Sequence, residues 1–319
     1  YHFAHIIDDH FMGTTHVVRG EEWLATLNIH LQLFRTMGWK APKYVHTAQL
    51  MKMDGGSKRK LSKRKDPELA LDFYNAEGYP VPSVLEYLMT LLNSNFEDWR
   101  LANPTAPMGD FQFTTKKMGN SGSLFDIDKL KDVSKNTISV MSADQVYDEV
   151  TAWAKDFDPQ LYTLLTADEQ KAKAIFAIGR GGAKPRKDIA IWSEVKDYVA
   201  FFYEELFTAA SEYPENVSTQ DALDILTQYR SLYSPADDGE TWFNKVRELG
   251  ESLGFAAKPK DYKKNPDQYK GHVGDVSQVI RLAITGRTNS PDLCSVMQIL
   301  GEEVCQQRLA QAIELLSNR

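Results

Sequence analysis

Residues 14–24 read Thr-Thr-His-Val-Val-Arg-Gly-Glu-Glu-Trp-Leu and give the first indication of the fold. The β-branched run at their start, residues 14–18, predicts a strand. From Glu21 to Met37, apolar residues recur at offsets of three, four and seven, which predicts an amphipathic helix that ends at Gly38. A further apolar stretch covers residues 44–51. A strand, a helix and another apolar stretch in this order are typical of α/β architecture.

The first residues of the chain are also apolar. The chain begins Tyr-His-Phe-Ala-His-Ile-Ile, without methionine. We expect Ala4, Ile6 and Ile7 to lie in a buried strand. Because a domain rarely begins in the middle of its core, we also expect an N-terminal part of the protein to be missing from this chain.

The strongest positive charge lies in residues 51–67, which read Met-Lys-Met-Asp-Gly-Gly-Ser-Lys-Arg-Lys-Leu-Ser-Lys-Arg-Lys-Asp-Pro. Gly55 and Gly56 predict a flexible hinge. We expect a mobile loop whose lysines neutralise the charge of a phosphoryl group. A solvated charged linker is the alternative, since short lysine-rich runs are common.

The rest of the chain shows mainly helical patterns. They cover residues 68–92, whereas residues 93–123 are rich in Asn, Pro, Gly, Ser and Thr and predict an irregular segment. Beyond residue 136 almost every pattern is helical, and Ser142 with Gln145 predicts a capping box. We expect further helices to begin near Ser218 and Ser290. The C-terminal half is therefore predicted to be a helical bundle or array.

The composition excludes several classes of protein. The 319 residues include 37 basic and 44 acidic side chains, so the net charge of −7 excludes a cationic nucleic-acid coat but permits local basic patches. Hydrophobic residues at 42% exclude a disordered chain, and no apolar run is long enough to cross a membrane. Cys294 and Cys305 cannot form a disulfide framework or a four-cysteine zinc site, so we expect reduced thiols.

Six of the seven histidines precede residue 47 and suggest a metal site. However, a strand at the N-terminus would place His2 and His5 on opposite faces, and no compact group of three ligands is visible. We therefore predict no protein-bound metal, zinc included.

The sequence Lys60-Leu61-Ser62-Lys63-Arg64 resembles the Lys-Met-Ser-Lys-Ser signature of class I aminoacyl-tRNA synthetases, in the form common in glutamyl-tRNA synthetases. The preceding residues 8–23, Asp-Asp-His-Phe-Met-Gly through Glu-Glu-Trp, resemble the stretch that comes before this signature. Residues 71–79, 121–130 and 282–293 are similar to later family segments in the same order. The resemblance covers most of the chain.

This resemblance implies a mostly α-helical chain of several domains. Residues 1–55 would be the C-terminal half of the catalytic domain, a partial α/β nucleotide-binding portion of Rossmann-like type. Residues 56–136 would hold the signature loop and the stem-contact domain. An all-helical anticodon-binding region would follow in two parts, residues 137–230 and 231–319.

The activity that the resemblance implies is glutamate–tRNA ligation. Such an enzyme activates L-glutamate with ATP to glutamyl-adenylate and transfers the glutamyl group to the 3′ end of tRNA(Glu) in protein biosynthesis. Mg²⁺ would arrive with ATP. We further expect a cytoplasmic monomer that does not bind membranes.

The resemblance also implies roles for individual residues. In the signature loop, the catalytic residues would be Lys60, Ser62, Lys63 and Arg64. The residues at ATP would be Glu22, Trp23 and Lys63, and those at glutamate would be Tyr1, His5 and Arg19. A basic turn between two predicted helices is expected to contact tRNA phosphates through Arg180, Lys184, Arg186 and Lys187.

Two features depart from the family pattern. His5 stands where the family usually has Asn, and the His-Ile-Gly-His signature is absent from the chain. Residues 272–275, His-Val-Gly-Asp, echo that signature, but we interpret them as a helix start. We therefore expect this chain alone to be inactive. A non-catalytic tRNA- or RNA-binding module on a synthetase scaffold, and a helical scaffold without an RNA role, are the alternatives.

Overall fold

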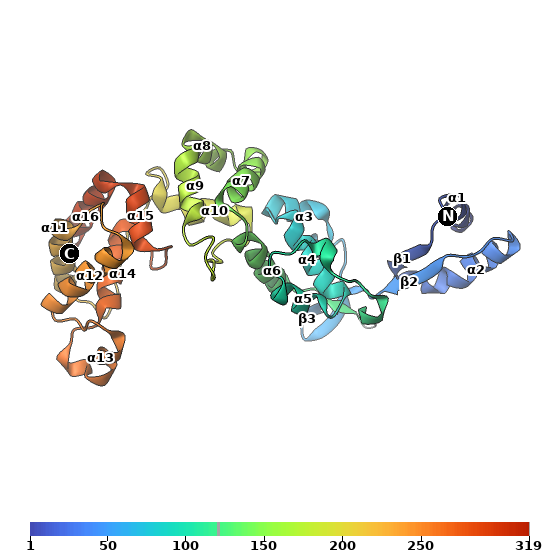
Figure 1. The fold of residues 1–319 in the computed structure, drawn as a ribbon, viewed down its shortest axis with the longest axis horizontal. Helices are drawn as coiled ribbons and strands as arrows, with labels where there is room; N and C mark the ends of the chain where they lie inside the picture. Colours follow the sequence, from blue (N-terminus) through green and yellow to red (C-terminus); the bar gives the residue numbers. More distant parts are fainter. Residues whose placement is uncertain (120–121, 319) are drawn as a thin grey trace. The chain divides into compact units, whose positions relative to one another are not determined.

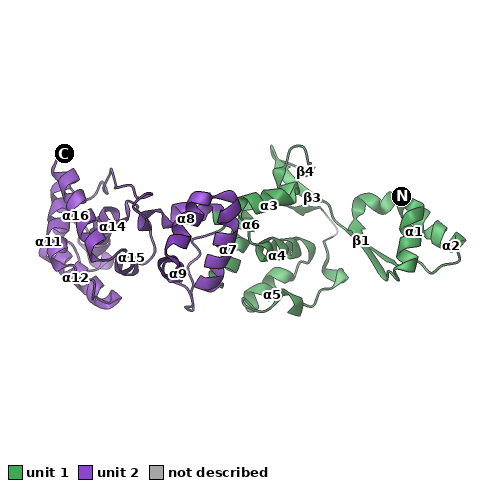
Figure 2. Ribbon diagram, turned by 90° about the horizontal axis from the view of Figure 1, so that it is seen from above, with its two compact units in different colours: residues 1–140, 190–192 green, residues 141–189, 193–319 purple. Residues whose placement is uncertain are grey.

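The computed structural model describes residues 1–119 and 122–318, which form two compact units (Figure 2). Unit 1 comprises residues 1–140 together with 190–192, and unit 2 comprises residues 141–189 and those from 193 onward. Ser121, the first residue of the segment assigned to stem contact, lies outside the described residues. The division into four domains stays a prediction.

Unit 1 begins with a small α/β portion and continues with helices around a second small sheet (Figure 1). Its elements are α1 (His2–Phe11), β1 (His16–Gly20), the 3-10 helix η1 (Glu21–Thr26), α2 (Leu27–Thr36), β2 (Lys43–Thr47), β3 (Leu50–Asp54), β4 (Ser57–Lys60), η2 (Pro67–Leu69), α3 (Leu71–Glu77), α4 (Val81–Leu92), α5 (Phe96–Ala102), η3 (Met108–Asp110), η4 (Thr115–Lys117), β5 (Ser123–Leu124) and α6 (Ile127–Ser139).

The α/β prediction is confirmed for residues 16–47. Strands β1 and β2 pair in parallel from His16 opposite Lys43 to Gly20 opposite Thr47, and η1 and α2 form the crossover between them. The predicted helix therefore starts as a 3-10 turn. Its buried side chains are His30 and Phe34 rather than the full apolar stripe.

The predicted N-terminal strand is wrong, because residues 2–11 form helix α1. Short apolar runs do not distinguish a strand from a helix by periodicity alone. In the helix, Ile6 is fully buried, and His2 and His5 lie three residues apart on the same face. The predicted placement of these two histidines on opposite faces is therefore wrong as well.

The basic segment, predicted to be a mobile loop with a glycine hinge, begins as a β-hairpin. β3 and β4 form an antiparallel hairpin, with Met51 opposite Lys60 and Asp54 opposite Ser57. Gly55 and Gly56, at φ values of 55° and 86°, form its two-residue turn, where the left-handed backbone favours glycine. The hairpin is anchored by Leu61, which is 4% exposed and belongs to the core cluster of unit 1.

The segment predicted to be irregular contains helix α5. Phe96, at 1% exposure, packs edge-to-face on Phe111 with 5.0 Å between ring centroids. Burial of these rings overrides the turn-forming composition around them. The remaining described residues of the segment have short 3-10 turns, an isolated antiparallel bridge between Asn93 and Met118, and β5, which pairs in parallel with β3.

Unit 2 is helical, as predicted. Its elements are α7 (Ala143–Phe157), α8 (Pro159–Ala167), α9 (Glu169–Ala177), η5 (Trp192–Glu194), whose first residue belongs to unit 1, α10 (Val195–Val199), η6 (Ala200–Phe202), α11 (Thr219–Leu232), α12 (Gly239–Ser252), α13 (Pro259–Lys264), η7 (Pro266–Gln268), α14 (Val273–Thr285), α15 (Leu293–Leu300) and α16 (Glu302–Ser317). In its described part, β pairing is limited to an isolated bridge between Ala256 and His272.

The predicted helix starts of unit 2 are largely confirmed. Ser142 and Gln145 form the reciprocal capping box at α7, and Ser218 caps α11. His272 caps α14 in the same reciprocal way with Asp275, so the helix-start interpretation is correct. The cap of α15 is Asp292 rather than Ser290. Among the described residues, none of the helices is sufficiently long and apolar to cross a membrane.

Candidate functional site

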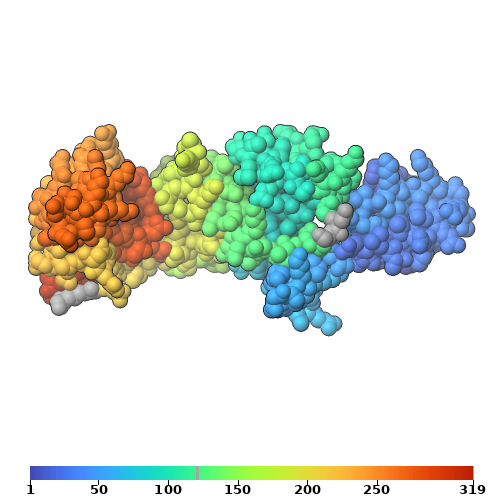
Figure 3. Space-filling view, turned by 90° about the horizontal axis from the view of Figure 1, so that it is seen from below, coloured from blue at the N-terminus to red at the C-terminus, as the bar shows by residue number. Residues whose placement is uncertain are grey.

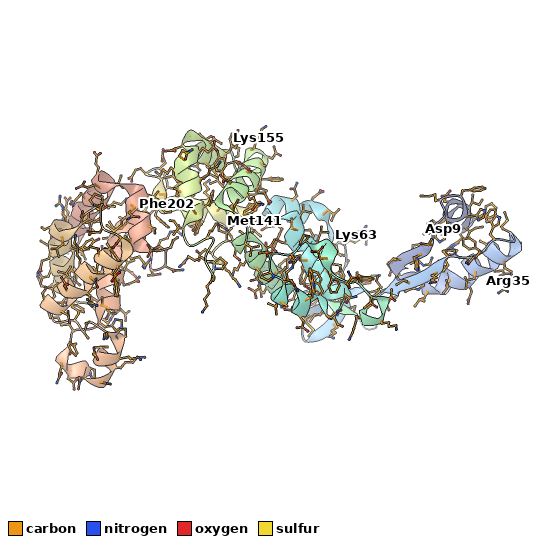
Figure 4. The ribbon with its side chains drawn as sticks, in the orientation of Figure 1. Asp9, Arg35, Lys63, Met141, Lys155 and Phe202 are labelled. Atoms are coloured by element: carbon orange, nitrogen blue, oxygen red, sulfur yellow. The ribbon has the colours of Figure 1, made fainter. Side chains whose placement is uncertain are left out.

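The signature residues lie at the end of the β3–β4 hairpin, which stands out from unit 1 in the space-filling view (Figure 3). Lys60, Lys63 and Arg64 are exposed, whereas Leu61 between them is buried. Lys63 is labelled in Figure 4. No carboxylate among the described residues pairs with these three cations. Their charges are therefore available to an anionic ligand.

Two other basic residues of the hairpin, Arg59 and Lys52, are paired with carboxylates. Arg59 donates from Nη1 and Nη2 to both carboxylate oxygens of Asp66, at 2.6 and 2.8 Å, and from Nε to Asp54 at 2.6 Å. Lys52 contacts Glu68 and lies 3.7 Å from Asp66. The Arg59 hydrogen bond holds the pKa of Asp66 well below its usual range. Sequence reasoning missed Asp66 and Glu68, although both follow the signature directly.

Asp66 also shapes the turn that carries Lys63. Its Oδ2 accepts a hydrogen bond from the Ser62 amide at 2.7 Å, and its own amide donates to the Ser62 carbonyl at 2.8 Å. The amide of Lys65 donates to the same carbonyl at 2.9 Å. Ser62 thus has a structural role in closing one turn, and the side chains of Lys63 and Arg64 project from it.

A second polar cluster lies in the α/β portion around Arg19. The Nε of Arg19 donates to Nε2 of His46 at 3.1 Å, and Nη2 donates to the Trp23 carbonyl at 3.2 Å. Nη1 lies 3.0 Å from Nδ1 of His30. The guanidinium also lies over the ring of Tyr44, with Cζ 4.9 Å from the ring centroid. β1, β2, η1 and α2 together hold this arginine in place.

The structure brings the predicted glutamate residues together at this cluster. The ring of Tyr1 stacks on His5 and on Trp23, with centroid distances of 6.3 and 5.1 Å. The ring of His5 lies 4.5 Å from that of His30, and its Nε2 is 3.2 Å from Asp9, which Figure 4 labels on α1. Trp23, predicted at ATP, therefore lies beside the residues predicted at glutamate.

Among the described residues, Glu22 makes no hydrogen bond or ion pair with this cluster. Its side chain is exposed and lies over Gly20, where a Cβ atom would come within 2.1 Å of Oε2 of Glu22. A side chain at position 20 would therefore displace Glu22. Its predicted role at ATP stays a prediction.

His30 is the buried centre of the cluster, with no exposed surface. Burial, and next the charges of His5 and Arg19, lower its pKa to about 4. Burial and Arg19 lower the pKa of His46 as well. Both imidazoles are therefore neutral at physiological pH. Sequence reasoning missed their roles, although the concentration of histidines before residue 47 was a signal.

The four cations predicted to contact tRNA are not equivalent. Arg180 donates to the carbonyls of Phe176 at 2.6 Å and Met141 at 3.4 Å, and burial lowers its pKa. Arg186 makes two hydrogen bonds to Asp188, at 2.6 and 2.9 Å. Lys184 and Lys187 are exposed, with no carboxylate partner in the described part of the chain.

Over residues 1–119 and 122–318, the histidines, cysteines and carboxylates form no group of three that could hold a metal ion. The exposed lysines of the hairpin suit the oxygens of a triphosphate. A Mg²⁺ ion would then be held by the phosphates of a bound nucleotide.

Comparison with known proteins shows the family of the chain. Residues 1–132 match the family described as tRNA synthetases class I (E and Q), catalytic domain, and residues 145–313 match the family described as anticodon binding domain. The chain belongs to the class I tRNA synthetases of the glutamate and glutamine group. Its catalytic-domain match contains the Arg19 cluster and the hairpin, and its anticodon-binding match contains the basic turn.

Individual synthetases give the same result. The chain is 51% identical over 313 residues to a glutamate–tRNA ligase of Acetivibrio thermocellus and 30% identical over 318 residues to that of Thermus thermophilus, with 98% of the chain covered in each case. It spans 57% and 60% of the lengths of these relatives.

A crystal structure of a glutamate tRNA ligase from Elizabethkingia meningosepticum, in complex with its amino acid, has the same fold. The TM-score is 0.69 at 24% identity, over 98% of this chain and 60% of that one. The fold predicted from the sequence, mostly helical with a partial α/β portion, is therefore confirmed.

Proposed function

We propose that this chain is part of a glutamate–tRNA ligase that uses ATP to activate L-glutamate and transfers the glutamyl group to tRNA(Glu). Relatives that carry this name are similar over 98% of the chain. The observation that carries the proposal is the division of charge in the basic hairpin. Arg59 and Lys52 are paired with carboxylates, whereas the signature cations Lys60, Lys63 and Arg64, like Lys58 and Lys65 beside them, have no carboxylate partner among the described residues.

This division suits phosphoryl chemistry. Asp66 and Glu68 neutralise Arg59 and Lys52, which fixes the hairpin without using the signature lysines. Lys63 then projects from a closed turn as a point charge, the form in which lysine binds phosphate. In the proposed reaction, a carboxylate oxygen of glutamate attacks the α-phosphorus of ATP and pyrophosphate leaves. Lys63 would offset the negative charge that builds on the phosphates.

The Arg19 cluster supplies the second half of the proposed site. A guanidinium can bind a carboxylate through two parallel hydrogen bonds, and Tyr1, His5 and Trp23 surround Arg19 with aromatic rings. We propose that Arg19 binds glutamate, with Tyr1 and His5 beside it. Glu22 and Trp23 are proposed to lie at ATP.

The test is substitution of Lys63 in the intact enzyme that contains this chain. Lys63→Ala is expected to lower the rate of ATP–pyrophosphate exchange by roughly 10²–10³-fold, as for the loss of a transition-state donor. Lys58→Ala is the matched control, since Lys58 is an exposed lysine of the same hairpin outside the signature. An unchanged exchange rate in Lys63→Ala would refute the catalytic role.

For the helical region, we propose that Lys184 and Lys187, with Arg186, contact the tRNA phosphates. Arg180 would act indirectly, since it holds the turn through two carbonyls. Double replacement of Lys184 and Lys187 by Ala should make the plot of log K for tRNA(Glu) binding against log salt concentration less steep. The change in slope should correspond to the loss of about two phosphate contacts. Replacing Lys155 and Lys171 on α7 and α9 is the control. An unchanged salt slope would exclude these contacts.

One experiment separates the ligase from the alternative, a tRNA-binding module without catalysis. The chain alone, which lacks a His-Ile-Gly-His sequence, is expected to bind tRNA(Glu) but to show no glutamate-dependent exchange. An inactive longer parent protein would favour the binding module. We further propose that the protein is cytoplasmic and monomeric. Sedimentation of the purified protein checks the monomeric state.

A further inference from the structure

The donor groups of Arg19 show an unusual set of partners. A guanidinium has five N–H groups that can donate hydrogen bonds, and it has no acceptor. Three of these bonds are directed at His46, His30 and the carbonyl of Trp23. Two N–H bonds, one on each terminal nitrogen, therefore have no hydrogen-bond acceptor among the described residues.

The protonation of both imidazoles follows from these contacts. Because Arg19 can only donate, Nδ1 of His30 and Nε2 of His46 must both be unprotonated acceptors. The remaining proton of neutral His30 is then on Nε2, which lies 2.9 Å from Nδ1 of His2. The remaining proton of neutral His46 is on Nδ1. The hydrogen bonds therefore run outward from Arg19 in two branches, one to His46 and one through His30 to His2.

The charge of Arg19 is not neutralised within this cluster. No carboxylate among the described residues forms an ion pair with Arg19. The groups that face His30 are His2, His5 and Asp9 from α1, Arg19 from β1 and Tyr44 from β2. Those at His46 are Arg19 and Tyr44. Asp9, the carboxylate of this set, lies 3.2 Å from His5 and not at the guanidinium.

We propose that His30 and His46 are positioning residues, which as neutral acceptors hold the Arg19 guanidinium so that its two free N–H bonds bind a carboxylate of the amino-acid substrate. The proposal rests on the proposed function for the identity of that substrate. Neutral acceptors orient the cation without cancelling its charge, whereas an aspartate in either place would compete with the substrate. Neither histidine needs to touch glutamate.

The neutrality of the imidazoles makes this arrangement sensitive to pH. A proton on Nδ1 of His30 would replace an acceptor with a donor and set two cations against each other. The low pKa of His30 delays this step until well below neutral pH. Carboxylate binding at Arg19 is therefore expected to weaken as the pH falls through the pKa of His30.

The first experiment reads the tautomers directly in this chain. Long-range ¹H–¹⁵N NMR spectra of the imidazoles at pH 7 are expected to show a proton on Nε2 of His30 and on Nδ1 of His46. The second state is diagnostic, because free neutral histidine prefers the proton on Nε2. In Arg19→Met, His46 should revert to that form and the pKa of His30 should rise. A wild-type His46 with its proton on Nε2, or spectra unchanged in Arg19→Met, would overturn the proposal.

The second experiment compares two variants of His46. Phe keeps the ring without an acceptor, whereas Gln supplies an amide oxygen that can accept from Nε of Arg19. Titration of the chain with L-glutamate, followed at the Arg19 Nε–H signal, is expected to show about tenfold weaker binding in His46→Phe and recovery in His46→Gln. Binding by His46→Phe at the wild-type affinity would refute the positioning role.

The two experiments separate the two claims. If the tautomers are as expected but the wild-type chain binds acetate and not L-glutamate, then the positioning of Arg19 is supported and the glutamate assignment fails. If glutamate binds while the tautomers are reversed, then the proposed function survives and the positioning fails. Unfolding curves of the His46 variants exclude a general loss of structure.

Discussion

Two arginines in different units are held in opposite ways. In unit 2, Arg308 is 2% exposed and donates to the carbonyls of Phe201 and Ile284, at 2.7 and 2.8 Å, and to Glu204 at 2.6 Å. In unit 1, Arg19 also makes three hydrogen bonds, but two of its partners are neutral imidazoles and none is a carboxylate.

The difference separates an arginine that joins helices from one whose charge has no carboxylate partner among the described residues. Arg308 links α16 to η6 and α14 and has its charge balanced by Glu204, so the bundle needs it. Arg19 is oriented but not neutralised. A cation in that state costs desolvation energy without a compensating ion pair, and the bound carboxylate would supply that pair.

The largest expected effect is the stability contrast between the two arginines. Arg308→Met should destabilise unit 2 by about 3 kcal/mol, because two buried carbonyls lose their donor. Arg19→Met should cost unit 1 less than about 1 kcal/mol, because the imidazoles can change tautomer once the cation is gone. Amide hydrogen exchange of α14 and α16, and of α1 and α2, measures the two effects separately. Equal losses would remove the distinction.

The folding stability of the two units should depend differently on pH. The pKa of His30 is about 4 in the folded state and 6.5 in the unfolded state. Between these values the unfolded chain binds more protons, so the stability of the α/β portion should fall as the pH falls from 6.5 to 4, by about 3 kcal/mol in total.

Unit 2 of the same protein serves as the control for this prediction. The helices of unit 2 contain one histidine, His272, and it is a capping residue that is not buried. Their hydrogen exchange should show no such slope between pH 6.5 and 5. His30→Asn should remove most of the slope in unit 1 and leave the smaller contribution of His46, whose pKa is lowered as well. An undiminished slope in this variant would assign the effect to another group.

A smaller effect is expected at the hairpin turn. Gly55 has a positive φ of 55°, so Gly55→Val should destabilise the β3–β4 hairpin by about 1–2 kcal/mol. Gly55→Asn is the matched variant, because Asn tolerates this conformation, and it should be nearly neutral. Exchange rates of the β3 amides measure both. If Val were tolerated as well as Asn, the turn would be a loose loop, as the sequence first suggested.

The smallest loss of stability is expected at the N-terminal cap of α7, in unit 2. Ser142→Ala removes the oxygen that accepts from the Gln145 amide at 3.1 Å and should cost about 1 kcal/mol. Ser142→Asp keeps an acceptor and should retain the wild-type stability. Thermal unfolding of the two variants, compared with wild type, gives the difference. A loss in Ser142→Asp as large as in Ser142→Ala would argue against the cap.

Local signals predicted the helical unit well. Capping residues act within three or four positions of their partners, so Ser142 and His272 could be assigned from the sequence. Strand β1 was predicted for the same reason, from a short β-branched run. In each case the deciding contacts lie close together along the chain.

The misassigned elements depend on distant contacts. The run at Ile6 suits both a strand and a helix, and only packing against α2 decides between them. The hairpin was interpreted as a hinge because the Gly55–Gly56 pair was considered without the strands on either side. The Arg19 cluster joins residues 4 to 28 positions apart. The donor-only chemistry of arginine, considered together with the six early histidines, could have suggested it.

Unit 1 is completed by three residues that come late in the chain. Ile191 is a member of its core cluster, the carbonyl of Ala190 accepts from Ser134 Oγ at 2.5 Å, and the amide of Trp192 donates to the Gly78 carbonyl at 2.8 Å. A fragment that ends at residue 140 of this chain would therefore lack part of the core of unit 1. Any attempt to produce unit 1 separately must supply residues 190–192, by a tether or as an added peptide.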